Sequence, residues 1–390
     1  MKRKFRIIVG MLLLAIPLCM NAQVKPQKPS QEPKKAKVEK TEKEEPVKPE
    51  KPEKPKGGFE MPKISGFVQG MFQANLSDKG DLIDNTFRMR RVRLSVDGNL
   101  SKTVSYKIQG DFVNNPMLVD AFVKYKPCKE FAIQLGQFKT PFTLESPINP
   151  VNLEIFDYGE SVQNLAGYSD VCGVGGLGRD IGVMATGSLF PIMGEEGYKY
   201  SIVDYAVGVF NGNGPVNFKK NEKGLDNNNR KDIVGRLEVH PGLKDLTLST
   251  SYYYGKYYKD EDNNGVRNRW TAGAQYNDGK LVLRGEYISG ETGYVTDIPE
   301  DLGYFNSNGY YAQAGYYFQA GEQKIMPVLR YEHFNANTAL VNGGGGTNWY
   351  TAGINYWPLK SVNFKLDYSL IQKESGTNSH RVVGILSYKF

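Results

Sequence analysis

The chain of 390 residues contains only 3 cysteines and 3 histidines, and it has little that is continuously hydrophobic. No stretch reaches the roughly 18 consecutive apolar residues of a transmembrane helix. The scattered histidines, His240, His333 and His380, suggest no Ser-His-acid arrangement, and sparse cysteines predict no metal site. Cys128 and Cys172 either form a disulfide or remain two free thiols. The sequence therefore predicts no enzyme, no cofactor and no bound metal.

The first 22 residues have the pattern of a cleaved secretory signal. A basic segment from Lys2 to Arg6 precedes an apolar run from Ile7 to Met20, which is too short to span a bilayer. Cleavage is expected after Ala22. A lipid anchor on Cys19 is not favoured, because Leu18 stands where a small residue is expected. We therefore expect an exported protein.

Residues 23–57 consist mainly of Lys, Pro and Glu. Such a segment cannot bury a core and is predicted to be a disordered periplasmic tail. It serves either as a solvated spacer or as a tether to the cell wall or another partner. Residues 1–57 hold 15 of the 49 basic residues but only 7 of the 42 acidic ones, so residues 58–390 are nearly neutral. This balance gives no argument for binding nucleic acid.

From Ile64 onward, apolar and polar residues alternate with period 2 between turn signals, as in half-buried strands. Strands are expected near 64–76, 86–98, 104–113, 119–126, 131–138, 180–190, 200–210, 232–240, 246–258, 268–277, 280–290, 308–319, 324–335, 348–357, 361–373 and 380–390. Because only helices and closed barrels satisfy the backbone in lipid, we predict an all-β fold, a transmembrane antiparallel barrel of about 16 strands over residues 58–390.

The connections between these strands alternate in length, as they do in outer-membrane barrels. Every second connection is short, such as 99–103 and 358–360, whereas 140–178 and 211–231 are long. A barrel of about 16 strands is wide enough for an aqueous channel. The third outer loop, 140–178, is the longest and is expected to fold inward and narrow the pore. The alternative is a flexible external loop.

The last predicted strand ends the chain on an aromatic residue. Leu386, Tyr388 and Phe390 share one face, while Ser387 and Lys389 fall on the other. A strand that is apolar on one side and polar on the other suits a barrel wall in lipid, and the three apolar residues are candidates for a signal read by the barrel-assembly machinery. The alternative is a half-buried strand of a soluble sandwich.

A cluster of four arginines, Arg88, Arg90, Arg91 and Arg93, distinguishes the second predicted strand. A β-bulge near Arg90 and Arg91 would turn most of them inward. Guanidinium groups in a wet pore create a path for anions, because each donates two hydrogen bonds to phosphate or carboxylate. The path would also include Lys107, Lys124 and Lys139. We predict that these seven residues line the lumen.

The same bases have a structural alternative, in which neighbouring acids neutralise them. Asp97, Asp111 and Asp120 are predicted to face inward beside them. Three later strands each carry an inward Arg-x-Glu pair: Arg236/Glu238, Arg284/Glu286 and Arg330/Glu332. Alternating charges of this kind form ion-pair lattices on a lumen wall. Anion selectivity and a lattice both remain open, and they are compatible.

Three segments resemble the phosphate-selective porin O and P family. They are FRMRRVRLSVDGNLSKTVSYKIQGDF (87–112), VDAFVKYKPCKEFAIQLGQFKTPF (119–142) and GRDIGVMATGSLF (178–190). The resemblance implies a trimeric, sixteen-stranded porin with an anion-attracting lumen. It also implies that Arg88, Arg90, Arg91, Arg93 and Lys139 are its matching basic positions. One departure is that residues 140–178 contain five acids, Glu145, Glu154, Asp157, Glu160 and Asp170, and no Lys or Arg.

The expected function is passive diffusion of small solutes across the bacterial outer membrane, with a preference for anions such as phosphate. If the acidic loop lines the constriction, it opposes anion passage, whereas Lys219, Lys220, Lys223, Arg230 and Lys231 either form a basic funnel or are a solvated charge run. The alternatives are a weakly selective general porin and a plugged structural or adhesive barrel. Expected partners are outer-membrane lipid, lipopolysaccharide, the assembly machinery and two further copies of the chain.

Overall fold

The computed structural model describes residues 61–113, 117–215, 226, 228–258, 264–293, 304–339, 345–376 and 378–390. The expected signal segment, the tail at 23–57 and Lys219, Lys220 and Lys223 lie outside these ranges. One antiparallel sheet dominates the described chain, and it closes because β1 pairs with both β2 and β17. Closure gives every strand of the described barrel a neighbour on both sides, as a sheet surrounded by lipid requires.

The sheet is a barrel of sixteen strands, because the short β13 continues β12 alongside the same neighbour, β14. The strands are β1 (Lys63–Ser77), β2 (Leu82–Asn99), β3 (Val104–Asp111), β4 (Met117–Tyr125), β5 (Ala132–Lys139), β6 (Arg179–Gly194), β7 (Gly197–Phe210), β8 (Asp232–Val239), β9 (Leu246–Tyr258), β10 (Asn264–Asn277), β11 (Leu281–Gly293), β12 (Tyr304–Tyr316), β13 (Phe318–Ala320), β14 (Gln323–Asn335), β15 (Thr347–Leu359), β16 (Val362–Lys373) and β17 (Asn378–Lys389). Each expected strand is present, so the predicted barrel is confirmed. The strand expected at 180–190 is longer than predicted, because β6 continues to Gly194.

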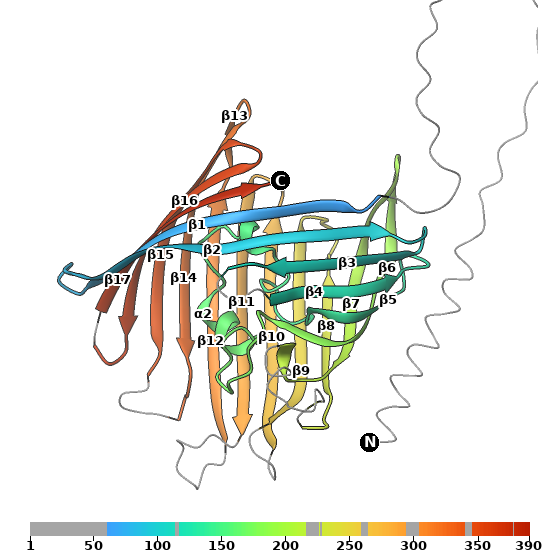
Figure 1. Ribbon diagram of the computed structural model, residues 1–390, viewed down its shortest axis with the longest axis horizontal. Helices are drawn as coiled ribbons and strands as arrows, with labels where there is room; N and C mark the ends of the chain where they lie inside the picture. The colour runs from blue at the N-terminus through green and yellow to red at the C-terminus, as the bar shows by residue number, and fades with distance from the viewer. Residues whose placement is uncertain are drawn as a thin grey trace, which may run out of the picture.

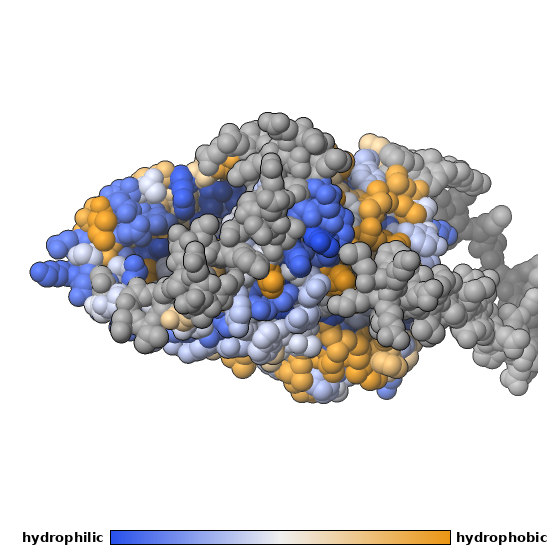
Figure 2. Space-filling model, turned by 90° about the horizontal axis from the view of Figure 1, so that it is seen from below, coloured by the Kyte–Doolittle hydropathy of each residue, from blue (hydrophilic) through white to orange (hydrophobic). Residues whose placement is uncertain are grey.

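The wall has its polar residues buried and its apolar residues exposed. On β16, Lys365 and Asp367 are buried, whereas Phe364 and Leu366, which alternate with them, are about half exposed. Soluble proteins show the opposite arrangement, so this surface is suited to a hydrocarbon environment. Hydrophobic residues accordingly gather in patches along the flank of the molecule in Figure 2. Among the helices that the structure describes, none has the length and apolar character needed to cross a membrane.

The connection between β5 and β6 contains the two short helices of the described chain, η1 (Pro150–Asn152) and α2 (Glu160–Leu165). It leaves and rejoins the wall at one point, because Lys139 and Arg179 are cross-strand partners and the Thr140 N–H donates to the Gly178 carbonyl at 3.0 Å. Figure 1 shows this green segment with the strands around it, and α2 in contact with β11, β12 and β14. We call residues 140–178 the β5–β6 segment.

The seam between β1 and β17 gives a test of barrel closure. The backbone groups of Gly66 and Phe390 exchange hydrogen bonds of 2.9 and 3.1 Å. A Cβ atom at Gly66 would lie 2.5 Å from the Arg93 carbonyl oxygen and 2.6 Å from Cζ of Phe390. We therefore expect Gly66→Ala to destabilise the barrel by about 1 to 3 kcal/mol, measured by thermal unfolding in detergent. Gly70→Ala is the matched control, because its Cβ would meet nothing within 4 Å.

Candidate channel site

The β5–β6 segment is fixed to part of the inner wall by apolar contacts. Val162 and Leu165 of α2 belong to one buried cluster with residues from several strands. The wall residues in this cluster include Phe210, Val234, Tyr253, Ile288, Tyr311 and Phe334. Burial of this apolar surface holds the segment against β7 to β14. These contacts cover that part of the buried face of the wall.

Ion pairs add a second set of anchors between the segment and the wall. Four of the segment's five acids pair with six wall arginines. The pairs are Glu145 with Arg330, Glu154 with Arg284, Asp157 with Arg90 and Arg91, and Asp170 with Arg267 and Arg269. The Glu154 pair is bidentate, with N···O distances of 2.9 and 3.0 Å. The acidic loop is thus neutralised by the wall and does not present four free carboxylates to a solute.

Asp170 shows how strongly these acids are held in the charged form. Its carboxylate is buried, and the guanidinium groups of Arg267 and Arg269 each lie 3.1 Å away. Burial alone would raise the pKa of Asp170, but the two arginines outweigh it and lower the pKa to about 2. Cys172 donates to Asp170 at 3.0 Å as a free thiol, so it forms no disulfide with Cys128. Burial and the nearby Asp170 charge raise the pKa of Cys172 to about 12.

Glu160 is the acid of the segment for which the described residues supply no ion pair. Burial, followed by repulsion from Glu332, raises the pKa of Glu160 to about 7 from its ordinary 4.5, while Arg381 acts in the opposite direction. Asp157 adds a smaller repulsion. The backbone N–H of Glu160 donates to a Glu332 carboxylate oxygen at 2.8 Å, which keeps the two acids close. The charged form of Glu160 therefore weakens the attachment of α2.

A pH dependence follows from this raised pKa. The cost of charging Glu160 is absent below about pH 4.5, grows between pH 4.5 and 7, and is complete above pH 7. We expect Glu160→Gln to stabilise the protein at pH 8 by about 1 to 3 kcal/mol and to have little effect at pH 4.5. Thermal unfolding in detergent at both values measures this. An equal change at both pH values would contradict the assignment.

The arginines of β2 divide between the loop and the wall. The predicted bulge is present at Arg90, because Gln69 pairs with Arg91 and Gly70 with Met89. Arg90 and Arg91 both bind Asp157 of the β5–β6 segment. Arg93 donates to Asp111 on β3 at 2.9 Å. Arg88 is exposed and has no ion pair among the described residues. Three of the four arginines are therefore in ion pairs.

The predicted Arg-x-Glu lattice is only partly present. Arg330 and Glu332 pair at 2.8 Å, and Arg236 and Glu238 lie at 3.5 Å. Arg284 instead binds Glu154 of the loop. Its expected partner, Glu286, accepts the Leu144 backbone N–H at 2.7 Å. The loop thus takes over one of the three wall pairs.

A hollow of about 250 Å³ remains between the segment and the wall formed by β2 to β6. We call it the basic passage. Its charged lining residues are four cations and one anion: Arg93, Lys107, Lys139, Arg179 and Asp120. Asp120 is already occupied, because it accepts from Arg179 at 2.7 and 3.3 Å. The passage therefore carries an excess of positive charge.

The predicted lysines occupy different parts of this region. Lys107 lines the basic passage without an ion pair to any described carboxylate. Lys139 also lines it, but its Nζ donates to the Ile148 carbonyl at 3.0 Å and to the Tyr158 hydroxyl at 2.8 Å, and so anchors the loop. Lys124 lines a second hollow of about 250 Å³, whose other charged residues are Lys126, Lys129, Arg236, Asp204 and Glu238. Arg179 was not predicted from the sequence, although it opens a strand.

The profile of phosphate-selective porin O and P matches residues 63–387. The chain belongs to this family. It is therefore an outer-membrane porin, and its membrane-spanning part is the barrel described above. No curated protein sequence matches the chain.

Solved porins share the fold of this protein at low sequence identity. The anion-selective porin from Comamonas acidovorans has a TM-score of 0.61 and 14% identity, with 85% of this chain and 99% of that chain covered. OmpF of Salmonella typhi has a TM-score of 0.58 and 15% identity, covering 84% and 97%. The trimer form of OmpT of Vibrio cholerae has a TM-score of 0.53 and 11% identity, covering 85% and 100%.

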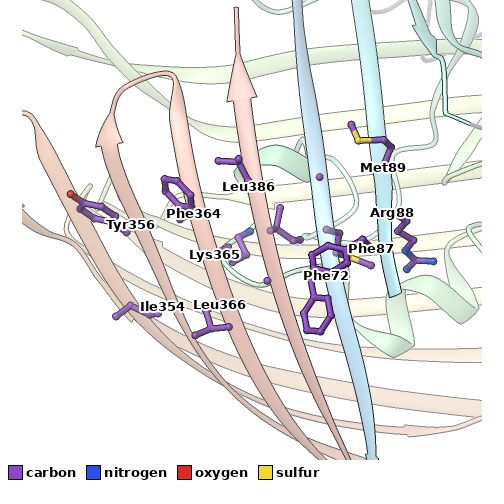
Figure 3. A pocket seen from close by; sticks show the side chains of 14 residues that line it. Phe72, Phe87, Arg88, Met89, Ile354, Tyr356, Phe364, Lys365, Leu366 and Leu386 are labelled. Carbon is purple, nitrogen blue, oxygen red and sulfur yellow. The ribbon is translucent and has the colours of Figure 1, made fainter. Parts of the chain in front are cut away.

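A larger hollow of this porin, about 720 Å³, lies in the wall of β15, β16, β17, β1 and β2. Apolar side chains such as Phe72, Phe87 and Leu386 surround it in Figure 3, and all three are exposed or half-exposed. Arg88 lines this hollow rather than the basic passage. Its apolar lining suits hydrocarbon rather than a hydrated solute.

Proposed function

We propose that this porin conducts small anions through the basic passage. The observation that carries the proposal is the charge of the lining. Arg93 and Arg179 are compensated by Asp111 and Asp120. Lys107 and Lys139 also line the passage, and neither has an ion pair with a described carboxylate. A positive potential in a narrow, poorly screened pore raises the local concentration of anions. Phosphate is one candidate solute, in keeping with the family description.

Two groups of bases have different roles in this proposal. Lys107 and Lys124 carry the anion path, because they line hollows and have no carboxylate partner among the described ion pairs. Arg90 and Arg91 hold the β5–β6 segment through Asp157. The segment then sets the size limit of the channel. Four of the segment's five acids do not oppose anions, because the wall arginines compensate them.

A plugged structural barrel is the second candidate. The apolar packing of the β5–β6 segment against Phe210, Ile288 and Phe334 favours it, because this contact closes part of the lumen. The two candidates differ in one property, which is ion conductance of the purified protein in a planar bilayer. A barrel without conductance would overturn the channel proposal.

The charge test is the reversal potential under a KCl gradient, followed by the effect of added phosphate. We expect a reversal potential displaced toward that of chloride, and reduced current in phosphate. In Lys107→Gln/Lys124→Gln the chloride-to-potassium permeability ratio should fall about twofold or more. Lys102→Gln/Lys244→Gln, at exposed sites in turns, is the matched control and should leave the ratio unchanged. A cation-directed wild-type reversal would contradict the proposal.

The assembly of the porin is proposed on separate grounds. The trimer form of OmpT supports a homotrimer, and the exposed apolar wall suits contact with lipid, lipopolysaccharide or a second copy. Leu386, Tyr388 and Phe390 lie on the exposed face of the closing strand, where the assembly machinery has access to them. We also propose that residues 1–22 are cleaved on export and that residues 23–57 form a periplasmic spacer or cell-wall contact.

A further inference from the structure

We propose that the basic passage selects organic carboxylates with an apolar, ring-sized body over small hydrophilic anions of the same charge. This inference rests on the proposed anion channel and names its substrate class. Its basis is that the lining of the passage has two chemically different parts. The cations described above form one part. The other part is apolar and consists of Phe122, Phe138, Met184, Pro147 and Pro150.

The two parts meet at one cross-strand pair of the wall. Lys107 on β3 and Phe122 on β4 are direct partners in the sheet register, and both line the passage. Side chains of such partners stand about 5 Å apart at Cβ. A carboxylate held by Lys107 therefore places the rest of its molecule beside the Phe122 ring. Phe138, which is buried in the apolar cluster, packs against Phe122 with its ring centroid 6.0 Å away in an edge-to-face arrangement.

Inorganic phosphate matches only one part of this lining. A phosphate ion presents oxygen atoms on every side, and each of them needs a donor or water. Prolines 147 and 150 have no backbone N–H to offer, and the rings of Phe122 and Phe138 have no hydrogen-bond donors. The lining also contains three side-chain amides, Gln109, Gln134 and Asn149. The amide of Gln109 already donates to the Ser95 hydroxyl. An anion with an apolar face can place that face against the apolar part of the lining without losing hydrogen bonds to water.

The experiment measures block of the KCl current by benzoate and by acetate, which carry the same charge. We expect benzoate to reach half-block at a concentration about tenfold lower than acetate, equivalent to about 1.4 kcal/mol. Phosphate should resemble acetate in having no apolar advantage. In Phe122→Gln the two half-block concentrations should approach each other, whereas Phe122→Leu, which keeps an apolar side chain, should retain most of the difference.

The possible outcomes distinguish a failure of this inference from a failure of the proposed anion channel. Equal block by benzoate and acetate in a chloride-selective wild-type channel would overturn the inference and leave the anion channel intact. A cation-selective or non-conducting wild-type protein would overturn both. The comparison of benzoate with acetate uses the wild-type porin, so it decides the matter even if a Phe122 variant fails to fold. A benzoate preference that persists unchanged in Phe122→Gln would also contradict the proposed site.

Discussion

Replacing Arg284 with glutamine is expected to loosen the β5–β6 segment and enlarge the channel. Arg284 and Glu154 form a buried bidentate pair, with 2% and 8% of their side chains exposed. Removing one partner leaves a buried carboxylate with Gln313 as its remaining side-chain donor, at 3.0 Å. Such losses cost about 3 to 5 kcal/mol. We expect a lower unfolding temperature in detergent and a single-channel conductance increased by about twofold or more.

The double variant Arg284→Gln/Glu154→Gln is the matched control. It removes both charges and restores an amide pair, so most of the stability and the small conductance should return. The wall remains otherwise unchanged, because Gln275 still accepts or donates beside position 284. If Arg284→Gln and the double variant behave alike, the ion pair does not hold the loop. A stability loss without any change in conductance would mean that the segment does not control the pore.

The barrel could be predicted from the sequence because a period of two needs no long-range information. The alternation of apolar and polar residues alone assigns residues such as Phe364 and Lys365 to opposite faces of the sheet. The sheet then follows if each strand pairs with the next strand along the chain. The bulge at Arg90 could be predicted for the same reason, because the apolar residues of this strand change there from odd to even positions. The family resemblance is confirmed by the match over residues 63–387. The domain boundaries at the N-terminus remain predictions.

The site was less predictable, because its contacts join residues far apart in the chain. Glu145 and Arg330 are 185 positions apart, and Glu154 and Arg284 are 130 apart. Alternation assigns Arg330 to the inner face, but it cannot say that a loop acid rather than Glu332 alone will neutralise it. The sequence did contain one signal: a long loop with acids and no bases, within a chain whose wall carries unexplained arginines. The aromatic lining at Phe122 had no such signal.

These pairings resolve the apparent conflict between an acidic loop and an anion channel. The acids Glu145, Glu154, Asp157 and Asp170 neutralise arginines of the wall. Lys107, which has no ion pair among the described residues, lines the hollow that the loop leaves open. Charge in this lumen is therefore sorted by position. The paired charges, such as those of Arg284 and Arg330, hold the loop against the wall. Lys107, which is in no described ion pair, lines the proposed solute path. Counting charges along the sequence cannot make this distinction.

Deletion of the β5–β6 segment is expected to change the conductance of the channel more than Arg284→Gln does. Lys139 and Arg179 are cross-strand partners, so residues 140–178 can be replaced by a two-residue Asn-Gly turn. The six wall arginines named above then lose their loop partners and face water. We expect conductance to rise about threefold or more, because a sixteen-stranded barrel encloses a wide aqueous lumen. Chloride selectivity should persist despite the greater width, because the removed segment carries acids and no bases.

Single-channel conductance and reversal potential in a planar bilayer measure both effects on the same protein. Circular dichroism of the purified deletion variant serves as the check that the barrel still forms. A matched variant adds Arg267→Gln/Arg269→Gln to the deletion and should lower the chloride preference without reducing the conductance. If the deletion alone made the pore cation-selective, the wall would not be the source of anion preference. If the conductance stayed at its wild-type value, ions would not be passing beside the segment, and the basic passage would lose its assigned role.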